Sequence, residues 1–127
     1  MLEDIENLLL QLADEDFCYL TTTGRVTGRP HEIEIWFGRQ DSSIYLMAGN
    51  HKSDWVLNVR KNPRVSVRID EHMFGGRANI VSNQQEEMRA RYLLAEKYQE
   101  WETEGTLSEW ARTALVVGIE LSLAEQQ

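Results

Sequence analysis

The residues best suited to binding an anion lie in a short glycine-rich stretch, GRVTGR, at positions 24–29. Gly24 and Gly28 have no Cβ, so backbone N–H groups can approach a ligand closely there. The hydroxyl of Thr27 and the guanidinium groups of Arg25 and Arg29 can donate hydrogen bonds to phosphate or carboxylate oxygens. The pattern alone fits either an anion site or a plain turn between two strands.

A second candidate lies in the stretch MAGNHKSDWVLNV, residues 47–59. Here a strand is expected to end in Gly-Asn, and a helix is expected to begin after Ser53. The free N–H groups and the dipole of a helix N-terminus favour an anion, and Lys52 adds a positive charge nearby. The alternative is an ordinary strand, turn and helix in which Trp55 and Val59 fill the core.

The familiar catalytic motifs are absent from the sequence. It contains no G-x-S-x-G motif, no P-loop and no H-E-x-x-H motif. His31, His51 and His72 lack the spacing of metal ligands, so no metal centre is expected. Glu32 and Glu34 share one face of an expected strand and could act as paired carboxylates, although such pairs more commonly form a solvated face.

The charge distribution favours a small anionic ligand over a nucleic acid. The chain has 127 residues and a formal net charge of −8 at pH 7, whereas nucleic-acid binding relies on Lys and Arg that neutralise phosphates. Residues 21–77 hold nine basic and six acidic side chains, a net of +3, and the remainder has a net of −11. A locally basic middle fits a small anion; ordinary scatter of surface charge is the alternative.

Length and composition predict a single domain over residues 1–127, because 42% of the residues are hydrophobic and can form a real core. No apolar run is long enough for a transmembrane helix, and the acidic start, MLEDIENLLLQLADED, is unlike the basic start of a signal peptide. The single cysteine, Cys18, rules out an internal disulfide and fits a reducing cytoplasm. We expect Cys18 to be a small core residue.

The spacing of apolar residues predicts the order of the elements that must position these stretches. The expected strands are 17–23, 31–37, 44–48, 65–69, 78–81 and 114–123, with a turn over 24–30, a hairpin loop over 39–43 and a turn at Gly75 and Gly76. Two of the expected helices are short: one over 54–61 is capped by Ser53, and one near the C-terminus is capped by Thr106 and Glu109. A helix over 2–14 is expected to bury Leu2, Ile5, Leu9 and Leu12. A long helix is expected to begin with a capping box of Ser82 and Gln85 and to carry one stripe of Met88, Tyr92, Ala95, Tyr98 and Trp101. This spacing leaves no room for repeated βαβ crossovers. The expected fold class is therefore α+β, a mostly antiparallel sheet that closes into a small barrel with peripheral helices.

Taken together, the two stretches resemble a known family. TTTGRVTGRP, an alternating strand, and then GNHKSDWVLNVRKNPRVSVRI are similar to the deazaflavin-dependent nitroreductases, a family of split-barrel flavin-binding proteins related to the pyridoxamine 5'-phosphate oxidase-like flavin reductases. The similarity runs from about Tyr19 to Ile69 and is weaker through the long helix and the last strand. It implies an FMN-binding split barrel fold and a redox cofactor, coenzyme F-420 or, less often, FMN.

The resemblance also implies which residues bind the cofactor. The phosphate or tail region would be held by Thr23, Gly24, Arg25, Thr27 and Gly28. A second anion-binding turn would consist of Ala48, Gly49, Asn50, His51 and Lys52, above a short helix anchored by Trp55 and Asn58. Trp36 could flank the ring of the cofactor or be a surface aromatic. Both cofactors carry phosphate, and F-420 adds carboxylates. The basic residues in the middle of the chain would bind these anionic groups.

This sequence departs from the family pattern in two places. The usual Gly-Gly before the lysine is Gly-Asn-His here. Glu32 and Glu34 stand where many relatives carry apolar residues or Pro. If these carboxylates face the pocket, they would repel an anionic cofactor unless they pair with Arg25, Arg29 or Lys52.

The implied activity is transfer of a hydride from reduced F-420 to a quinone, a nitro compound or another conjugated acceptor. The cofactor does the chemistry in such enzymes, so no protein nucleophile is required. The same fold with FMN, and a binding protein without turnover, are the alternatives. An aromatic set of Tyr92, Tyr98, Trp101 and Trp110 could line an acceptor pocket or be plain core. The expected partners are a small-molecule acceptor and, because barrels of the wider superfamily often pair, a second copy of the chain; no nucleic acid is expected.

Overall fold

The computed structural model describes the backbone of residues 2–123 and the side chains of residues 5–123. Its helices are α1 (Leu2–Leu12), α2 (Asp54–Lys61), α3 (Gln84–Tyr98) and α4 (Glu109–Thr113). Its strands are β1 (Cys18–Thr23), β2 (Pro30–Ile35), β3 (Gly38–Gln40), β4 (Ser43–Ala48), β5 (Arg64–Ile69), β6 (His72–Ile80), β7 (Trp101–Thr103), β8 (Thr106–Leu107) and β9 (Leu115–Leu123). The α+β class and most expected elements are confirmed.

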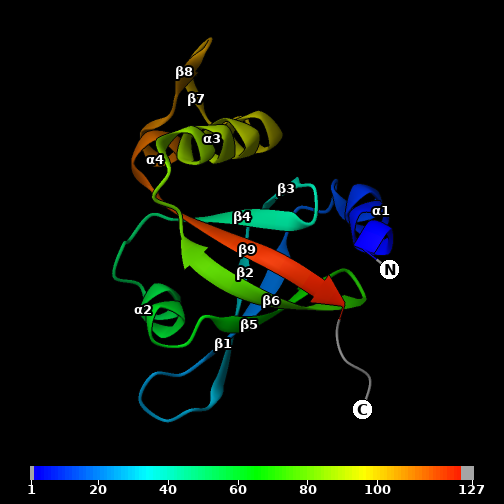
Figure 1. Cartoon of the computed structure of the whole chain (residues 1–127). Helices are drawn as coiled ribbons and strands as arrows, with labels where there is room; N and C mark the ends of the chain where they lie inside the picture. The colour runs from blue at the N-terminus through cyan, green and yellow to red at the C-terminus, as the bar shows by residue number, and fades with distance from the viewer. Residues whose placement is uncertain (1, 124–127) are drawn as a thin grey trace.

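Seven of these strands form one curled antiparallel sheet in the order β2-β1-β5-β6-β9-β4-β3 (Figure 1). The two strands at the ends of this order, β2 and β3, follow one another in the chain and are joined only by Trp36 and Phe37. They are not hydrogen-bonded to each other within the described part of the chain. The sheet is therefore a barrel with an open seam, and the linking residues lie at that seam.

Alternating side chains divide the core into two clusters. In β4, Ile44 and Leu46 point into the barrel, where α1 and α2 also place apolar residues. Tyr45 and Met47 of the same strand point outward and are covered by α3 and α4. Figure 1 shows α3 and α4 together on one side of the sheet, with the β7–β8 hairpin beyond them. Strand β4 is thus buried on both faces, which explains its continuous apolar sequence.

Two expected turns are misplaced. The stretch over 39–43 is not all loop, because residues 38–40 form β3 and the turn falls at Asp41, which has a φ of 55°. Gly75 and Gly76 are not a turn but lie within the continuous strand β6, and the turn precedes it at Asp70, with a φ of 54°. A Cβ on Gly76 would lie 2.7 Å from Cγ2 of Ile119. This glycine therefore serves close packing across the sheet.

The helix caps also differ in detail from the expectation. The N-cap of α3 is Asn83, whose side chain accepts from the N–H of Glu86, so the Ser82–Gln85 capping box is wrong. The cap of α4 is Ser108, which accepts from the N–H of Ala111, in place of Thr106. The buried face of α3 was predicted only in part: Ala95 is buried as expected, but Met88 and Tyr92 are exposed and Trp101 lies outside the helix. The other buried residues of α3 are Ala90, Arg91 and Leu94.

Buried Arg91 explains part of the difference between the predicted and the observed buried face of α3. Its guanidinium donates to the carbonyl oxygens of Ala111 and Ala114 at 3.0 and 2.8 Å and forms an ion pair with Glu87 at 2.6 Å. An arginine that satisfies the free carbonyls at the end of α4 belongs on the inner face of α3. This contact fixes α4, and with it Trp110, against the rest of the fold.

Candidate functional site

The β1–β2 hairpin is fixed onto α2 by Arg25. The backbone N–H of Arg25 and its Nη1 both donate to Oδ1 of Asn58, at 3.1 and 2.9 Å. Its Nη2 forms an ion pair with Asp54 at 3.1 Å. Asn58 is only 3% exposed and donates from Nδ2 to Oγ1 of Thr22 at 3.0 Å. The first glycine-rich stretch and the short helix are therefore brought together, as the sequence motif implied, although Arg25 already has an acidic partner.

Local geometry favours glycine at both glycine positions of the hairpin. A Cβ on Gly24 would lie 2.7 Å from Nε2 of His31 and 3.1 Å from the carbonyl oxygen of Arg29. Gly28 has a φ of +77°, which favours glycine. Its N–H donates to the carbonyl of Gly24 at 2.9 Å, and the hydroxyl of Thr27 accepts from the N–H of Arg29 at 3.2 Å. Turn geometry alone accounts for both glycines, so they are not independent signs of a ligand.

A pocket of about 250 Å³ lies between the hairpin and α2, and we call it the hairpin pocket. It is lined by Gly24, Arg25, Val26, Thr27, His31, Asp54 and Asn58. Thr23 ends β1 and is half-buried, and Gly28 lies at the exposed tip. The hairpin pocket therefore contains part of the predicted set, together with Asp54 and His31, which the sequence analysis did not assign to it.

The second predicted stretch forms a turn between β4 and α2, and we call residues 48–53 the lysine turn. The side chain of Asn50 accepts from the N–H of Lys52 at 2.8 Å, and the carbonyl of Asn50 accepts from the N–H of Ser53 at 3.1 Å. Ala48 is buried, whereas Gly49, Asn50, His51 and Lys52 are exposed. The Asn in place of the family's second glycine thus closes the turn with its own side chain.

The lysine turn also contacts α4. Nε2 of His51 lies 3.0 Å from the carbonyl oxygen of Thr113, and because a carbonyl only accepts, this contact places a proton on Nε2. A Cβ on Gly49 would lie 3.5 Å from Cδ1 of Trp110. Trp55 is 9% exposed and packs in the core, as expected of an anchor for α2.

One buried polar atom at the lysine turn has no partner. Ser53 occupies the N-cap position of α2, but its side chain makes no capping hydrogen bond, which corrects the expected cap. Its Oγ is buried and unpaired among the residues that the structure describes. If the Ser53 side chain turned outward, this hydroxyl at the helix N-terminus and the exposed Lys52 beside it could donate to a phosphate or carboxylate oxygen of an anionic cofactor. The residues present therefore fit such a group.

A second pocket, about 400 Å³ in volume, lies beside the seam, and we call it the aromatic pocket. It is lined by Phe17, Glu34, Ile35, Trp36, Met47, Glu100 and Trp110. Trp36 stacks on Tyr98 with ring centroids 4.2 Å apart and planes 3° apart. Trp110 stands almost perpendicular to Trp36, at 88° and 5.5 Å. The indoles form a rigid corner, and Trp110 links this pocket to Gly49 of the lysine turn.

Tyr98 and Lys97 hold the seam behind this corner. The Tyr98 hydroxyl donates to the carbonyl oxygens of Asp16 and Phe37, at 2.8 and 3.0 Å, as alternative acceptors, and accepts from the N–H of Phe37 at 3.0 Å. Burial raises the pKa of Tyr98 to about 12. The ammonium of Lys97 donates to the Phe37 carbonyl at 3.0 Å, and burial lowers its pKa. The linker between β2 and β3 is therefore firmly anchored.

The two glutamates of β2 have different positions. Glu34 lines the aromatic pocket, and its Oε1 accepts from the Tyr19 hydroxyl at 2.8 Å. That hydrogen bond is the main reason that the pKa of Tyr19 is raised. Glu32 is exposed and lines none of the pockets described here. Within residues 5–123, neither carboxylate pairs with Arg25, Arg29 or Lys52.

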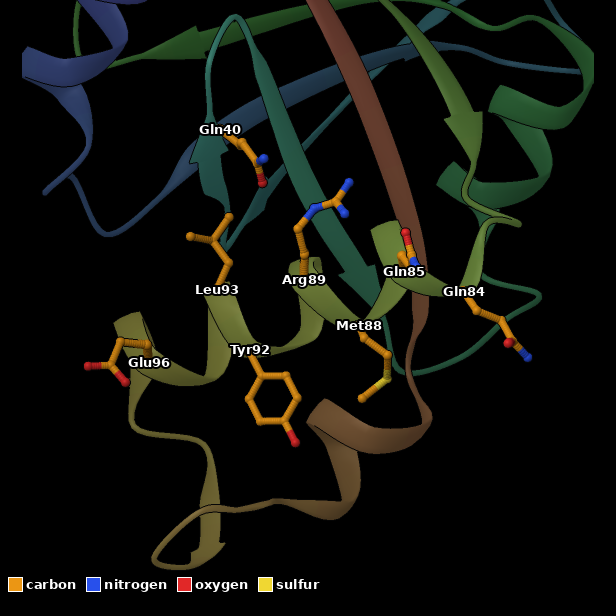
Figure 2. A pocket seen from close by; sticks show the side chains of 8 residues that line it. All are labelled: Gln40, Gln84, Gln85, Met88, Arg89, Tyr92, Leu93 and Glu96. Atoms are coloured by element: carbon orange, nitrogen blue, oxygen red, sulfur yellow. The ribbon is translucent and has the colours of Figure 1, made fainter.

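The aromatic set expected to line an acceptor pocket is divided. Trp110 lines the aromatic pocket and Tyr98 supports it, but Tyr92 and Trp101 pack against each other elsewhere, with centroids 6.0 Å apart. The largest hollow, about 940 Å³, covers the outer face of α3 (Figure 2). Figure 2 shows Met88, Tyr92 and Glu96 along that helix, with Gln40 facing Leu93. It contains no residue of either motif, so we place the candidate site at the other two pockets.

Cys18 is fully buried, as expected, and burial raises the pKa of its thiol to about 12, so it stays protonated at neutral pH. No three His, Cys, Asp or Glu side chains in the described part of the chain gather to hold a metal ion. None of the helices over residues 2–123 is long and apolar enough to cross a membrane.

With this geometry, comparison with known proteins identifies the family. The family model of the F420H(2)-dependent quinone reductases matches residues 6–117. The chain therefore belongs to the F420H(2)-dependent quinone reductase family. This match covers both motifs, the seam, and α4 with Trp110.

Solved structures agree on the fold. A candidate pyridoxamine 5'-phosphate oxidase from Listeria innocua is similar, with a TM-score of 0.70, 18% identity and coverage of 93% of each chain. An F420-H2-dependent reductase, FDR-A, matches with a TM-score of 0.67 and 22% identity over 83% of this chain and 94% of its own. The heme storage protein HutZ from Vibrio cholerae matches with a TM-score of 0.67 and 15% identity, over 96% and 92% of the two chains. These similarities confirm the split barrel.

Proposed function

We propose that this protein binds reduced F-420 at the lysine turn and the hairpin pocket and transfers its hydride to a conjugated acceptor such as a quinone or nitro compound. The observation that carries the proposal is the unpaired Oγ of Ser53 at the N-terminus of α2, beside exposed Lys52. A buried hydroxyl without a partner is costly unless a ligand pairs with it. Family membership supports the choice of F-420.

The residues divide the task of binding between anionic and aromatic parts. Lys52 and Ser53 would hold a phosphate at the helix N-terminus, and Arg25, with Thr23, Gly24, Thr27 and Gly28 around it, would face the acidic tail. Ala48, Gly49, Asn50 and His51 shape the turn, and Trp55 and Asn58 keep α2 in place. Trp36 would flank the ring system. Reduced deazaflavin supplies the hydride when bound, so the chain itself need only bind, orient and exclude water.

Arg25 must exchange partners if it is to contact the cofactor. Its guanidinium is engaged with Asp54, whose side chain is 90% exposed. An exposed ion pair contributes little stability and is easily replaced. A phosphate or carboxylate that offers two oxygens could replace Asp54 while Asn58 keeps its contact with the backbone N–H of Arg25.

Three wider properties belong to the same proposal. We infer a single domain, a cytoplasmic location suited to a reduced cofactor and a buried free thiol, and a homodimer. A relative that forms a domain-swapped dimer, with 22% identity and a TM-score of 0.67, supports pairing. Sedimentation of the purified protein at increasing concentration tests the dimer separately from the chemistry.

Titration of the purified protein with F-420 and, separately, with FMN tests the proposed function. Quenching of the cofactor's fluorescence reports binding, and we expect micromolar affinity for F-420 and weaker binding of FMN. Tighter binding of FMN would assign the same fold to a flavin reductase. Binding of F-420 without turnover of any quinone or nitro acceptor would indicate a carrier. Failure to bind either cofactor would refute the proposal.

A further inference from the structure

We propose that the aromatic pocket takes the acceptor and that, among planar conjugated acceptors, it favours cationic rings over neutral ones of the same shape, an inference that deepens the proposed function and rests on it for the redox step. The pocket combines two indole walls with two carboxylates, those of Glu34 and Glu100. Indole faces attract cations through the ring quadrupole, and carboxylates do so through charge. Flat aromatic groups stack on indoles as well. A cationic ring system satisfies all of these groups at once.

Both carboxylates are positioned without being neutralised. Glu34 accepts from the neutral hydroxyl of Tyr19 at 2.8 Å, and Glu100 accepts from the neutral hydroxyl of Ser108 at 2.9 Å. No Lys or Arg within residues 5–123 forms an ion pair with either of them. Neither carboxylate is therefore paired with a Lys or Arg among these residues, and each has one oxygen that makes no hydrogen bond within them.

Lys97 and Arg68 are engaged outside the aromatic pocket. Lys97 sits over the ring of Phe37 at 3.7 Å, and its ammonium donates to the Phe37 carbonyl. The guanidinium of Arg68 lies over the ring of Tyr19, 4.2 Å from its centroid, and donates to the carbonyl of Asp70. Neither lines the aromatic pocket. The pocket thus lacks a cation of its own.

The charged side chains that line the aromatic pocket, Glu34 and Glu100, are both acidic. A cleft lined by one sign of charge concentrates counter-ions and speeds their entry. The volume of about 400 Å³ is within the range for small-molecule sites. Tyr98 covers one face of Trp36, so an incoming ring can stack only in the corner toward Trp110.

The charged residues near the two proposed binding sites would also direct the two substrates to different places, once the cofactor has replaced Asp54 as the partner of Arg25. An anionic cofactor is attracted to Arg25 and Lys52 and repelled from Glu34 and Glu100, whereas a cationic acceptor shows the reverse preference. On reduction, a ring carbon of the acceptor forms a C–H bond with the hydride, and its positive charge disappears as it gains two electrons. The reduced deazaflavin gives up that hydride and one proton and becomes oxidised. The neutral product no longer matches the carboxylates, which favours its release.

Calorimetric titration of the full chain without cofactor tests the inference. The probes are N-methylquinolinium chloride, a planar aromatic cation, and quinoline, which has the same ring system and is neutral at pH 7.5. We expect the cation to bind about tenfold more tightly than quinoline, as cation–π attraction and two nearby carboxylates imply. Raised ionic strength should reduce this difference.

Charge-neutral variants make the test specific. Glu34→Gln and Glu100→Gln keep an oxygen for Tyr19 and Ser108, and each should weaken binding of the cation roughly threefold to tenfold while leaving quinoline unchanged. Glu32→Gln, on the same strand but outside the pocket, should change neither. Equal affinity for the two probes, or an unchanged affinity for the cation in both pocket variants, would overturn the inference.

The outcome separates this inference from the proposed function. Selective binding of the cation by a protein that does not bind F-420 would support a cation site and refute the reductase. Binding of F-420 without any preference between N-methylquinolinium and quinoline would keep the reductase and refute the cation-selective pocket.

Discussion

The hairpin pocket is held together by polar contacts, whereas the aromatic pocket is held together by ring packing. In the former, buried Asn58 connects Thr22 and the backbone of Arg25. In the latter, Trp36 lies between Tyr98 and Trp110. The first has Arg25 facing it, and the second has Glu34 and Glu100. The lysine turn is close to both pockets: it leads into α2, and a Cβ on its Gly49 would lie 3.5 Å from Cδ1 of Trp110.

This difference suggests how a chain of net charge −8 would accommodate the proposed anionic cofactor. Nine of the thirteen Lys and Arg residues lie within residues 21–77, the segment that contains both the hairpin and α2. The acidic remainder is then free to form a pocket of opposite preference. Separate fields of this kind give specificity more than raw affinity. Each variant below perturbs one of these sites and is compared with a matched variant outside it.

The largest effect is expected from Asn58→Ala, which breaks the polar centre of the hairpin pocket. The substitution leaves the hydroxyl of Thr22 and the N–H of Arg25 without their partner in a buried region, which should cost about 2–4 kcal/mol of unfolding free energy. Urea unfolding measures this loss. Asn79→Ala, at an exposed position, should change stability by less than about 0.5 kcal/mol. A loss below about 1 kcal/mol for Asn58→Ala would show that these contacts do not hold the hairpin.

Arg25→Ala and Lys52→Ala should both weaken binding of F-420. Each removes a charge-assisted contact that contributes about 1.5–3 kcal/mol of binding free energy. Lys52→Ala should change stability little because Lys52 is exposed, whereas Arg25→Ala should also cost about 0.5–1.5 kcal/mol of unfolding free energy because Nη1 of Arg25 donates to buried Asn58. Fluorescence titration measures the affinity, and Arg39→Ala, which contacts only the carbonyl of Asp41 among the described residues, is the matched control. Unchanged affinity in both variants would place the anion site elsewhere.

The positioning of Arg25 and Lys52 was largely predictable from sequence. The alternation around Ile33 and Val67 indicated the strands, and the glycines at 24 and 28 indicated the hairpin. The family resemblance then linked the hairpin to the helix, which local patterns could not do, because their contact joins residues far apart in the chain. Asp54 was missed as the partner of Arg25 for the same reason.

The aromatic pocket was much less predictable. Its walls come from residues as distant as Phe17, Trp36, Met47 and Trp110, and no local pattern relates them. The apolar side chains at 88 and 92 suggested a core-facing stripe on α3, but both are exposed. Arg91 is buried in the helix instead, because its guanidinium donates hydrogen bonds to the free carbonyls at the end of α4. Gly75 and Gly76 looked like a turn because glycine is common in turns, but close strand packing also requires it.

The stacked pair in the aromatic pocket should show a measurable coupling energy. A double-mutant cycle of Trp36→Leu and Tyr98→Leu should give about 0.5–1.5 kcal/mol, since their rings are parallel and 4.2 Å apart. The pair of Tyr92 and Trp101, tilted by 39° at 6.0 Å, is the matched control and should couple less. Thermal and urea unfolding supply the free energies. Equal coupling in the two pairs would mean that the corner is not specially rigid.

The smallest effect is expected where Glu34 meets Tyr19, and it tests whether this carboxylate is charged as the aromatic pocket requires. The hydrogen bond to Glu34 is the largest cause of the raised pKa of Tyr19, followed by the charge of the same carboxylate, and Glu32 contributes least. Glu34→Gln should therefore lower the pKa of Tyr19, measured by phenolate absorbance against a Tyr19→Phe reference, and Glu32→Gln should lower it less. A pKa raised in the folded state adds stability that is present below the ordinary tyrosine pKa of 10.0 and is lost as pH rises through the folded value. The wild type should thus lose slightly more stability above pH 10.0 than Glu34→Gln does, and equal loss in the two proteins would contradict a charged Glu34 at Tyr19.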